Sequence, residues 1–184
     1  MSEVQPIRKR PEDGRTHNLL DYESERRRFS WDAERARHVT ADGLVNIGRE
    51  AVSRHVAEGR GEATALRWIA REGSTRDFSY DALDRLSNRF ANALAGLGIG
   101  RGERVFSLLG RVPALYAAAL GTWKAGMVFS PLFSAFGPEP VRARMTIGNA
   151  AVLVTTARLF RRKVAPVLAD MPFLKHVILV GGGE

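Results

Sequence analysis

The sequence lacks cysteine, has only four lysines among its 28 basic residues, and contains no long apolar run. Without cysteine, a disulfide framework, a thiolate metal site and a cysteine nucleophile are all excluded. Such a composition suits the reducing cytoplasm, where we expect the protein to reside. Every apolar stretch is interrupted within about ten residues, whereas a membrane-spanning helix needs about 20. The first residues have no apolar core, so we expect neither a secretory signal nor a membrane partner.

Positive charge is in excess, with a formal net charge of +8. The basic residues are nevertheless scattered and interleaved with acidic ones, as between Asp21 and Arg28. No motif that reads a nucleic-acid groove is present. We therefore do not expect a nucleic-acid partner. A small, basic nucleic-acid-binding protein remains an alternative hypothesis for the function. The 45% apolar content also excludes an intrinsically disordered chain.

The N-terminal residues differ in composition from the rest of the chain. Residues 1–20 are polar and are interrupted by Pro11 and Gly14, which predicts a disordered lead-in. After them come Tyr22, Phe29 and Trp31 among many charges. Because the spacing of these aromatics does not match one face of a helix, it predicts an extended arm.

The next part of the chain carries three local patterns. A helix is predicted from the capping residue Asn46 to a stop at Gly59. A hairpin follows, with its turn at Gly73-Ser74. Residues 80–98 then form an apolar stripe with helical spacing, and Ser79 can cap the start of that helix.

Beyond residue 100, short apolar runs alternate with helical segments. Strands are predicted at residues 104–109, 128–130, 152–155 and 177–180, and helices are predicted to begin at Pro113, Pro138 and Arg158. Pro131 is expected to end the second of these strands. Strands that alternate with helices predict an α/β fold, with a mostly parallel sheet and flanking helices. Right-handed crossovers would make this sheet doubly wound.

Two loops at the expected carboxyl ends of strands are candidate binding elements. In an open α/β sheet, ligands bind outside these ends. The loop from Phe133 to Gly137 follows the second strand, and the basic cluster Arg158, Arg161, Arg162 and Lys163 follows the third. The cluster could hold a phosphate. Ordinary packing of the loop and a solvated basic face remain the alternatives.

Several short motifs occur in order along the chain: Phe78-Ser79-Tyr80-Asp81-Ala82-Leu83, Gly102-Glu103-Arg104-Val105, Arg111-Val112-Pro113, and Trp123-Lys124-Ala125-Gly126 followed by Pro131-Leu132. In this order they resemble the N-terminal part of an acyl-CoA synthetase of the adenylate-forming superfamily. Within that superfamily, the chain most resembles the acetate–CoA ligases. The resemblance extends from about residue 20 to residue 184, so residues 21–184 are interpreted as an incomplete N-terminal AMP-binding domain.

The resemblance implies a reaction in two steps. Acetate attacks the α-phosphate of ATP with the help of Mg²⁺, giving acetyl-adenylate and diphosphate, and the thiol of coenzyme A then displaces AMP. The resemblance also implies coenzyme A contacts for Arg161 and for the small residues Ser134 and Ala135. A second arginine of the family falls near Val164, where Arg162 or Lys163 could substitute.

The family's phosphate loop and its C-terminal domain do not occur within the 184 residues. We therefore expect the chain to be inactive by itself and to depend on the C-terminal part of the same enzyme as a partner. No catalytic residue and no metal ligand is assigned. Two alternatives remain open: a truncated, non-enzymatic paralogue that acts as a binding partner, and a ligase for another short- or medium-chain acid.

Overall fold

The computed structural model describes residues 19, 21–40 and 43–181. These residues fall into two compact units, and the boundary between them in the sequence lies between His38 and Val39. Apart from Leu19, the predicted lead-in over residues 1–20 lies outside the described residues.

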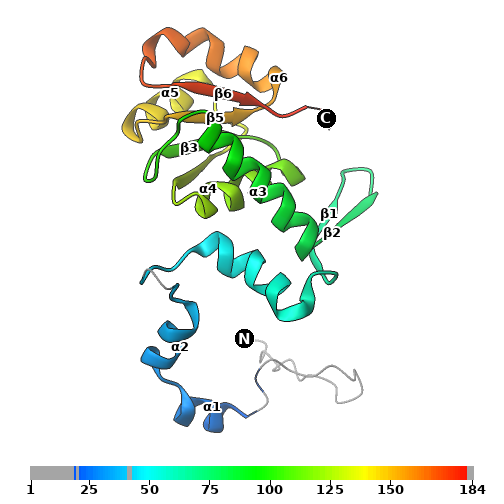
Figure 1. The fold of residues 1–184 in the computed structure, drawn as a ribbon. Helices are drawn as coiled ribbons and strands as arrows, with labels where there is room; N and C mark the ends of the chain where they lie inside the picture. The colour runs from blue at the N-terminus through cyan, green and yellow to red at the C-terminus, as the bar shows by residue number, and fades with distance from the viewer. Residues whose placement is uncertain (1–18, 20, 41–42, 182–184) are drawn as a thin grey trace, which may run out of the picture. The chain divides into compact units, whose positions relative to one another are not determined.

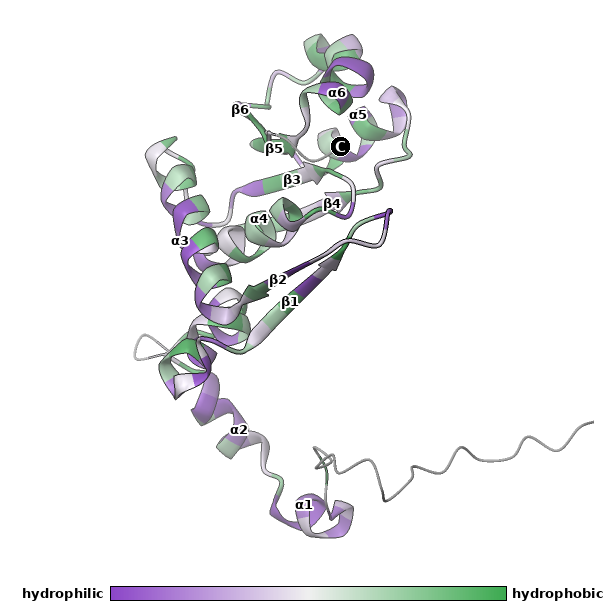
Figure 2. Cartoon of the chain, turned by 90° about the vertical axis from the view of Figure 1, so that its right-hand side faces the viewer, coloured by the Kyte–Doolittle hydropathy of each residue, from purple (hydrophilic) through white to green (hydrophobic). Residues whose placement is uncertain are grey.

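The first unit contains two short helices, α1 (Tyr22–Arg28) and α2 (Trp31–His38). The prediction of an extended arm is therefore wrong. Asp21 caps α1 by accepting a hydrogen bond from the backbone N–H of Ser24 at 3.0 Å. Ion pairs between residues one helical turn apart then stabilise both helices: Glu23–Arg26, Glu25–Arg28 and Glu34–Arg37. These local contacts form without an apolar face, and Figure 2 shows both helices as largely hydrophilic.

The second unit is built on a four-stranded parallel sheet, as the alternating pattern predicts (Figure 1). Its strands are β3 (Arg104–Leu108), β4 (Val128–Leu132), β5 (Val152–Thr155) and β6 (His176–Leu179). Their order across the sheet is β4-β3-β5-β6. The chain therefore moves from β3 outward to β4 and crosses back to β5. The strand order reverses between β3 and β5, where a doubly wound sheet has its switch point.

Pro131 lies inside β4, opposite Ser107 of β3, so the prediction that it ends the strand is wrong. The backbone N–H of Val128 donates to the carbonyl of Glu103. Because amides alternate in direction along a strand, the nitrogen of Pro131 faces away from β3. Since β4 is an edge strand, the missing N–H of proline removes no bond from the sheet.

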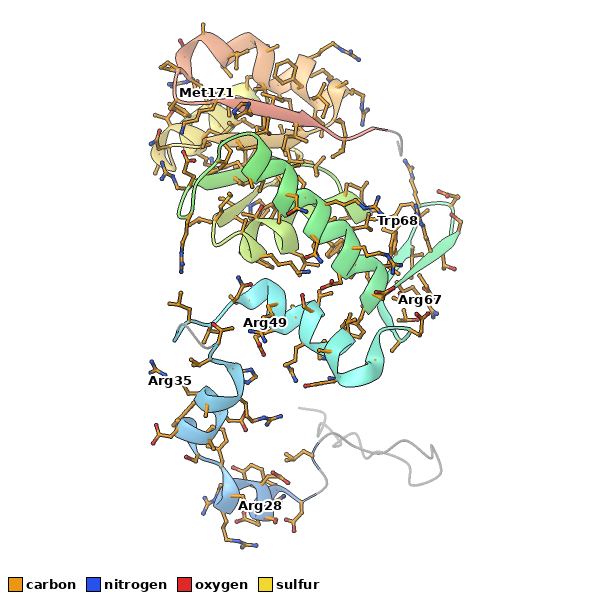
Figure 3. All side chains as sticks on the ribbon, in the orientation of Figure 1. Arg28, Arg35, Arg49, Arg67, Trp68 and Met171 are labelled. Atoms are coloured by element: carbon orange, nitrogen blue, oxygen red, sulfur yellow. The ribbon has the colours of Figure 1, made fainter. Side chains whose placement is uncertain are left out.

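Helices cover both faces of the sheet, and each face has its own apolar core. On one face lie α5 (Pro138–Ile147), α6 (Ala157–Leu159), η4 (Phe160–Val164) and η5 (Ala165–Asp170). The core under them includes Phe106, Leu108, Val141, Met145, Leu153 and Met171; Met171 is labelled in Figure 3. On the other face lie α3 (Tyr80–Gly96) and α4 (Pro113–Lys124). The core there includes Leu94, Val105, Ala118, Val152 and Val154.

The start of the second unit follows its local signals. Asn46 caps the first helix by accepting from the N–H of Arg49, and the helix contains the π-helical turns η2 (Arg49–Ser53) and η3 (Val56–Arg60). Its regular helical backbone stops at Gly59, which has a φ of 81°, and η3 ends one residue later at Arg60. The hairpin pairs β1 (Thr64–Ile69) with β2 (Thr75–Ser79) in antiparallel fashion. Ser79 then caps α3 through the N–H of Ala82, as predicted.

Candidate functional site

The loop after β4 and the basic turn after β5 contact each other, although 29 residues separate them along the chain. The side-chain ammonium of Lys163 donates a hydrogen bond to the backbone carbonyl of Ser134. Ser134 is half-buried, and Ala135 beside it is exposed. The structure thus brings together the two elements that the sequence proposed separately as a phosphate-binding cluster and a small-residue loop.

The basic residues of the turn have different environments. Arg161 and Arg162 are exposed, and neither takes part in an ion pair or hydrogen bond with any described residue. Lys163 is half-buried because it reaches the loop after β4. Val164, at the position where the family resemblance expects an arginine, is fully buried in the core. Among the described residues of this turn, Arg161 and Arg162 thus combine solvent exposure with side chains that have no ion-pair partner.

A groove of about 490 Å³ lies beside the same loop, and its lining is mainly apolar: Phe106, Ser130, Pro131, Leu132, Phe133, Phe136, Arg144, Ile147 and Gly148. The rings of Phe133 and Phe136 meet edge to face, with 5.7 Å between their centroids. The guanidinium of Arg144 lies 4.2 Å from the centroid of the Phe136 ring. An aromatic wall with a cation on its rim suits a ligand that is both planar and anionic.

Ile147 belongs to this groove rather than to the core. The sequence places Val141, Met145 and Ile147 on one side of the helix, and the structure buries the first two completely. Ile147 is 87% exposed, so it does not share their burial. It is the last residue of α5 before the Gly148 cap.

The carboxyl ends of β3 and β5 are tied together at the switch point. The hydroxyl of Thr155 donates to the carbonyl of Leu108 at 2.8 Å. The indole N–H of Trp68, in the hairpin, donates to the carbonyl of Arg111 at 2.7 Å. This hydrogen bond holds the loop after β3, and Trp68 is labelled in Figure 3. The hairpin therefore supports the carboxyl end of the sheet. Its sequence does not predict this contact.

Lys124 of the Trp-Lys-Ala-Gly motif lies in a partly buried polar network. Its ammonium is 2.7 Å from a carboxylate oxygen of Asp84 and donates to the side-chain oxygen of Asn88 at 2.8 Å. Ser53 donates to the same carboxylate at 2.6 Å, and Asn46 donates to the backbone carbonyl of Lys124. The network joins the helix that contains η2 and η3 to α3 and α4. In this chain, the lysine of the motif therefore has a structural role, because it links these helices.

The network changes the titration of Asp84. Burial alone would raise the pKa of this carboxyl, because it disfavours the charged form. Hydrogen bonds from Lys124 and Ser53, together with the positive charge of the ammonium, outweigh burial and hold the pKa of Asp84 below its ordinary value. Asp84 is thus a stable anion and not a proton donor near neutral pH.

His55 is a structural histidine. Its ring packs against that of Tyr80 with centroids 4.4 Å apart, and its Nδ1 contacts the guanidinium of Arg60. Burial and the charges of Arg60 and Arg54 lower the pKa of His55. The imidazole is therefore neutral near pH 7.

Over residues 19, 21–40 and 43–181, no group of three His, Asp or Glu side chains could hold a metal ion. In the same residues, no helix is long and apolar enough to cross a membrane. Sequence reasoning found the loop at Ser134 and the basic turn, but it missed Arg144 and the bond between Lys163 and Ser134. Both depend on contacts across strand crossovers, which no local pattern reveals.

Comparison with known proteins identifies a family and several relatives. Residues 53–183 match a family model described as AMP-binding enzyme. The chain is 37% identical over 170 residues to an acetyl-coenzyme A synthetase of Bacillus subtilis, a match that covers 90% of this chain and 29% of that protein. It is 29% identical over 182 residues to an acetyl-coenzyme A synthetase of Mycolicibacterium smegmatis, covering 88% of this chain and 19% of that protein.

The fold is also similar to that of a solved structure. The crystal structure of a Brucella canis acyl-CoA synthetase matches with a TM-score of 0.69 and 30% sequence identity, over 89% of this chain and 29% of that one. The chain thus spans between 19% and 29% of the length of these relatives.

Proposed function

The chain belongs to the AMP-binding enzyme family, and from this premise we propose that it is the N-terminal segment of a cytoplasmic acetate–CoA ligase. The whole enzyme would convert ATP, acetate and coenzyme A to acetyl-CoA, AMP and diphosphate through acetyl-adenylate. The observation that carries the proposal is the similarity to two acetyl-coenzyme A synthetases over nearly the whole chain.

In this proposal, the chain supplies the first part of the enzyme's scaffold and one side of a coenzyme A site. Coenzyme A carries phosphates, which arginine binds through charge-assisted hydrogen bonds. Arg161 and Arg162 fit this role because they are exposed and unpaired among the described residues. Ser134 and Ala135 are small, so a cofactor can approach the loop that Lys163 holds in place.

ATP and Mg²⁺ are assigned to the whole enzyme and not to this chain. The described residues offer no cluster of metal ligands, and Lys124, the lysine of the Trp-Lys-Ala-Gly motif, is committed to Asp84. We therefore propose that the 184 residues do not form acetyl-adenylate by themselves. Exchange of labelled diphosphate into ATP, assayed with acetate on the purified chain, should stay at the blank level. Exchange above the blank would refute this part of the proposal.

Coenzyme A binding tests the site directly. Isothermal titration of the chain with coenzyme A should show binding that Arg161→Ala weakens by about tenfold, the loss expected for one charge-assisted contact. Arg89→Ala is the matched control, because Arg89 is equally an exposed arginine but lies on α3, across the sheet from the loop. Equal effects of the two substitutions would show that the binding is non-specific attraction to a basic surface.

A further inference from the structure

The loop after β4 begins with a tight turn over residues 133–136. The backbone N–H of Phe136 donates to the carbonyl of Phe133 at 3.0 Å, which closes a β-turn with Ser134 and Ala135 at its two central positions. This bond forms in both common turn types, because types I and II differ in the direction that the peptide between the two central residues faces. The closing bond alone therefore leaves the direction of that peptide open.

Two other features fix the direction of the central peptide. A type II turn requires a positive φ at Ala135, whereas Asn149 is the only described non-glycine residue with a positive φ. The Cβ atom of Ala135 thus disfavours the flipped peptide. Lys163 acts on the same peptide from the turn after β5, because its ammonium donates to the carbonyl of Ser134.

The direction of the Ser134 carbonyl decides where the next N–H points. In a trans peptide the C=O and N–H groups point in opposite directions. Since the carbonyl of Ser134 faces Lys163, the N–H of Ala135 points away from Lys163. Ala135 is exposed, and its N–H makes no hydrogen bond with any described residue. The turn therefore presents a backbone donor that has a fixed direction and a small side chain beside it.

We propose that Lys163 is a positioning residue, which holds the central peptide of the turn so that the N–H of Ala135 donates to an oxygen of coenzyme A. The inference rests on the proposed function for the identity of the ligand. The phosphate oxygens of coenzyme A are strong acceptors for a backbone N–H. Lys163 also follows Arg162 directly, so the same bond keeps this donor beside the exposed arginines of the basic turn.

Four substitutions in the purified chain test the proposal. Lys163→Met removes the ammonium and keeps an unbranched apolar stem, whereas Lys163→Arg keeps a charged donor for the carbonyl. Lys175→Met is the matched control for the loss of one lysine charge, because Lys175 directly precedes β6 and so lies at the amino end of the parallel sheet, opposite the loop. Ala135→Gly removes the Cβ atom that disfavours the flipped peptide.

The bond from Lys163 is tested first without a ligand, by NMR measurement of the exchange of the Phe136 amide. Lys163→Met should accelerate this exchange by about fivefold or more, because the turn opens more often. Lys163→Arg and Lys175→Met should leave it within about twofold. Thermal unfolding verifies folding, with Lys163→Gln as the substitute for a methionine variant that does not fold. Unchanged exchange in the folded variant would overturn the proposal.

The affinity for coenzyme A then tests what the bond does. Isothermal titration should show that Lys163→Met weakens binding by about fivefold, the cost of ordering the loop, and that Lys163→Arg and Lys175→Met change it less than about twofold. In the Ala135→Gly background, Lys163→Met should weaken binding at least about twofold more than in the parent chain, because both features act on one peptide. Equal losses in the two backgrounds would mean that the ammonium contacts the ligand directly, which would overturn the positioning role.

The positioning role and the proposed function fail in different ways. If the parent chain does not bind coenzyme A while Phe136 exchange still depends on Lys163, the proposed function is contradicted and the hold of Lys163 on the turn stands. If Arg161→Ala weakens coenzyme A binding and Lys163→Met does not, the positioning role is overturned and the proposed function stands.

Discussion

Two buried hydroxyl groups on neighbouring strands differ in their hydrogen bonding. Ser107 on β3 and Thr155 on β5 are both fully buried. The Thr155 hydroxyl donates to the carbonyl of Leu108, whereas the Ser107 hydroxyl has no hydrogen-bond partner among the described residues. Burying an unpaired polar group costs free energy, whereas a paired group contributes to stability.

We therefore expect Ser107→Ala to raise the free energy of unfolding by about 1 kcal/mol. The matched control, Thr155→Val, should lower it by about 1 kcal/mol, because it removes the hydrogen bond that the buried hydroxyl donates to Leu108. Urea denaturation of both variants provides the measurement. A loss of stability in the alanine variant would mean that packing around Ser107 outweighs its unpaired hydroxyl.

His55 should make stability depend on pH. Burial and two nearby arginines lower the pKa of His55 in the folded state, so the unfolded chain binds the proton more readily. The contribution of the neutral imidazole is fully present above the ordinary pKa of histidine and is lost as the pH falls through that value towards the folded pKa.

We expect the free energy of unfolding to fall between pH 7.5 and pH 5.5, and His55→Gln to reduce that fall. Denaturant titrations at the two pH values measure it. The carboxyls with lowered pKa values, such as Asp84 and Glu103, lose their contribution only at lower pH. An equal fall in the variant would assign the pH dependence to another group.

At the scale of elements, an ion pair between Lys124 and Asp84 links α3 and α4. The Lys124 side chain is 9% exposed, so removing it leaves the carboxylate of Asp84 without its counter-charge. We expect Lys124→Met to cost about 3 kcal/mol or more. Lys175→Met is the control, because its pair with Glu103 is more exposed and should cost under about 1 kcal/mol.

Thermal and urea unfolding distinguish these two lysines. Adding Asp84→Asn to the Lys124→Met variant should recover part of the loss, since the uncompensated buried charge is then gone. If both lysine variants lose equally little stability, the network does not stabilise the contact between the helices.

The same two helices pack closely at Gly121 of α4. A Cβ atom at this position would lie 2.6 Å from the backbone carbonyl of Ser87 and 2.9 Å from the Phe90 side chain. Since a backbone atom cannot move aside alone, Gly121→Ala should push the helices apart and cost about 1–3 kcal/mol. Gly96→Ala is the control: a Cβ there meets nothing within 4 Å, and stability should rise by up to about 1 kcal/mol. Chemical denaturation compares the two, and equal effects would contradict close packing.

At the scale of the molecule, the two compact units should be separable. Neither α1 nor α2 contains a buried residue, so deleting these helices removes none of their side chains from a core. We expect the chain that starts at Val39 to keep a cooperative thermal transition within about 2 °C of the parent midpoint. Circular dichroism measures it, and a shift of more than about 5 °C would show that the first unit stabilises the second.

Much of the fold could be predicted from local patterns. The apolar stripe and Ser79 cap of α3, the Gly59 stop, and the alternation of strands with helices all depend on neighbours along the chain. The errors occurred where local information is ambiguous. The short charged helices α1 and α2 have no apolar periodicity, and Pro131 reads as a strand end unless the strand is known to be an edge.

The candidate site was predicted in parts and not as an arrangement. The loop at Ser134 and the arginines at 161 and 162 stand out as residue types at the ends of strands. The strand order β4-β3-β5-β6 decides that these elements lie close together and that β4 is an edge of the sheet. The packing of α3 on α4 decides that Lys124 pairs with Asp84. Secondary structure depends on contacts within a few residues. Lys163 and Ser134, 29 residues apart, and Lys124 and Asp84, 40 apart, meet only after the chain has crossed over and packed.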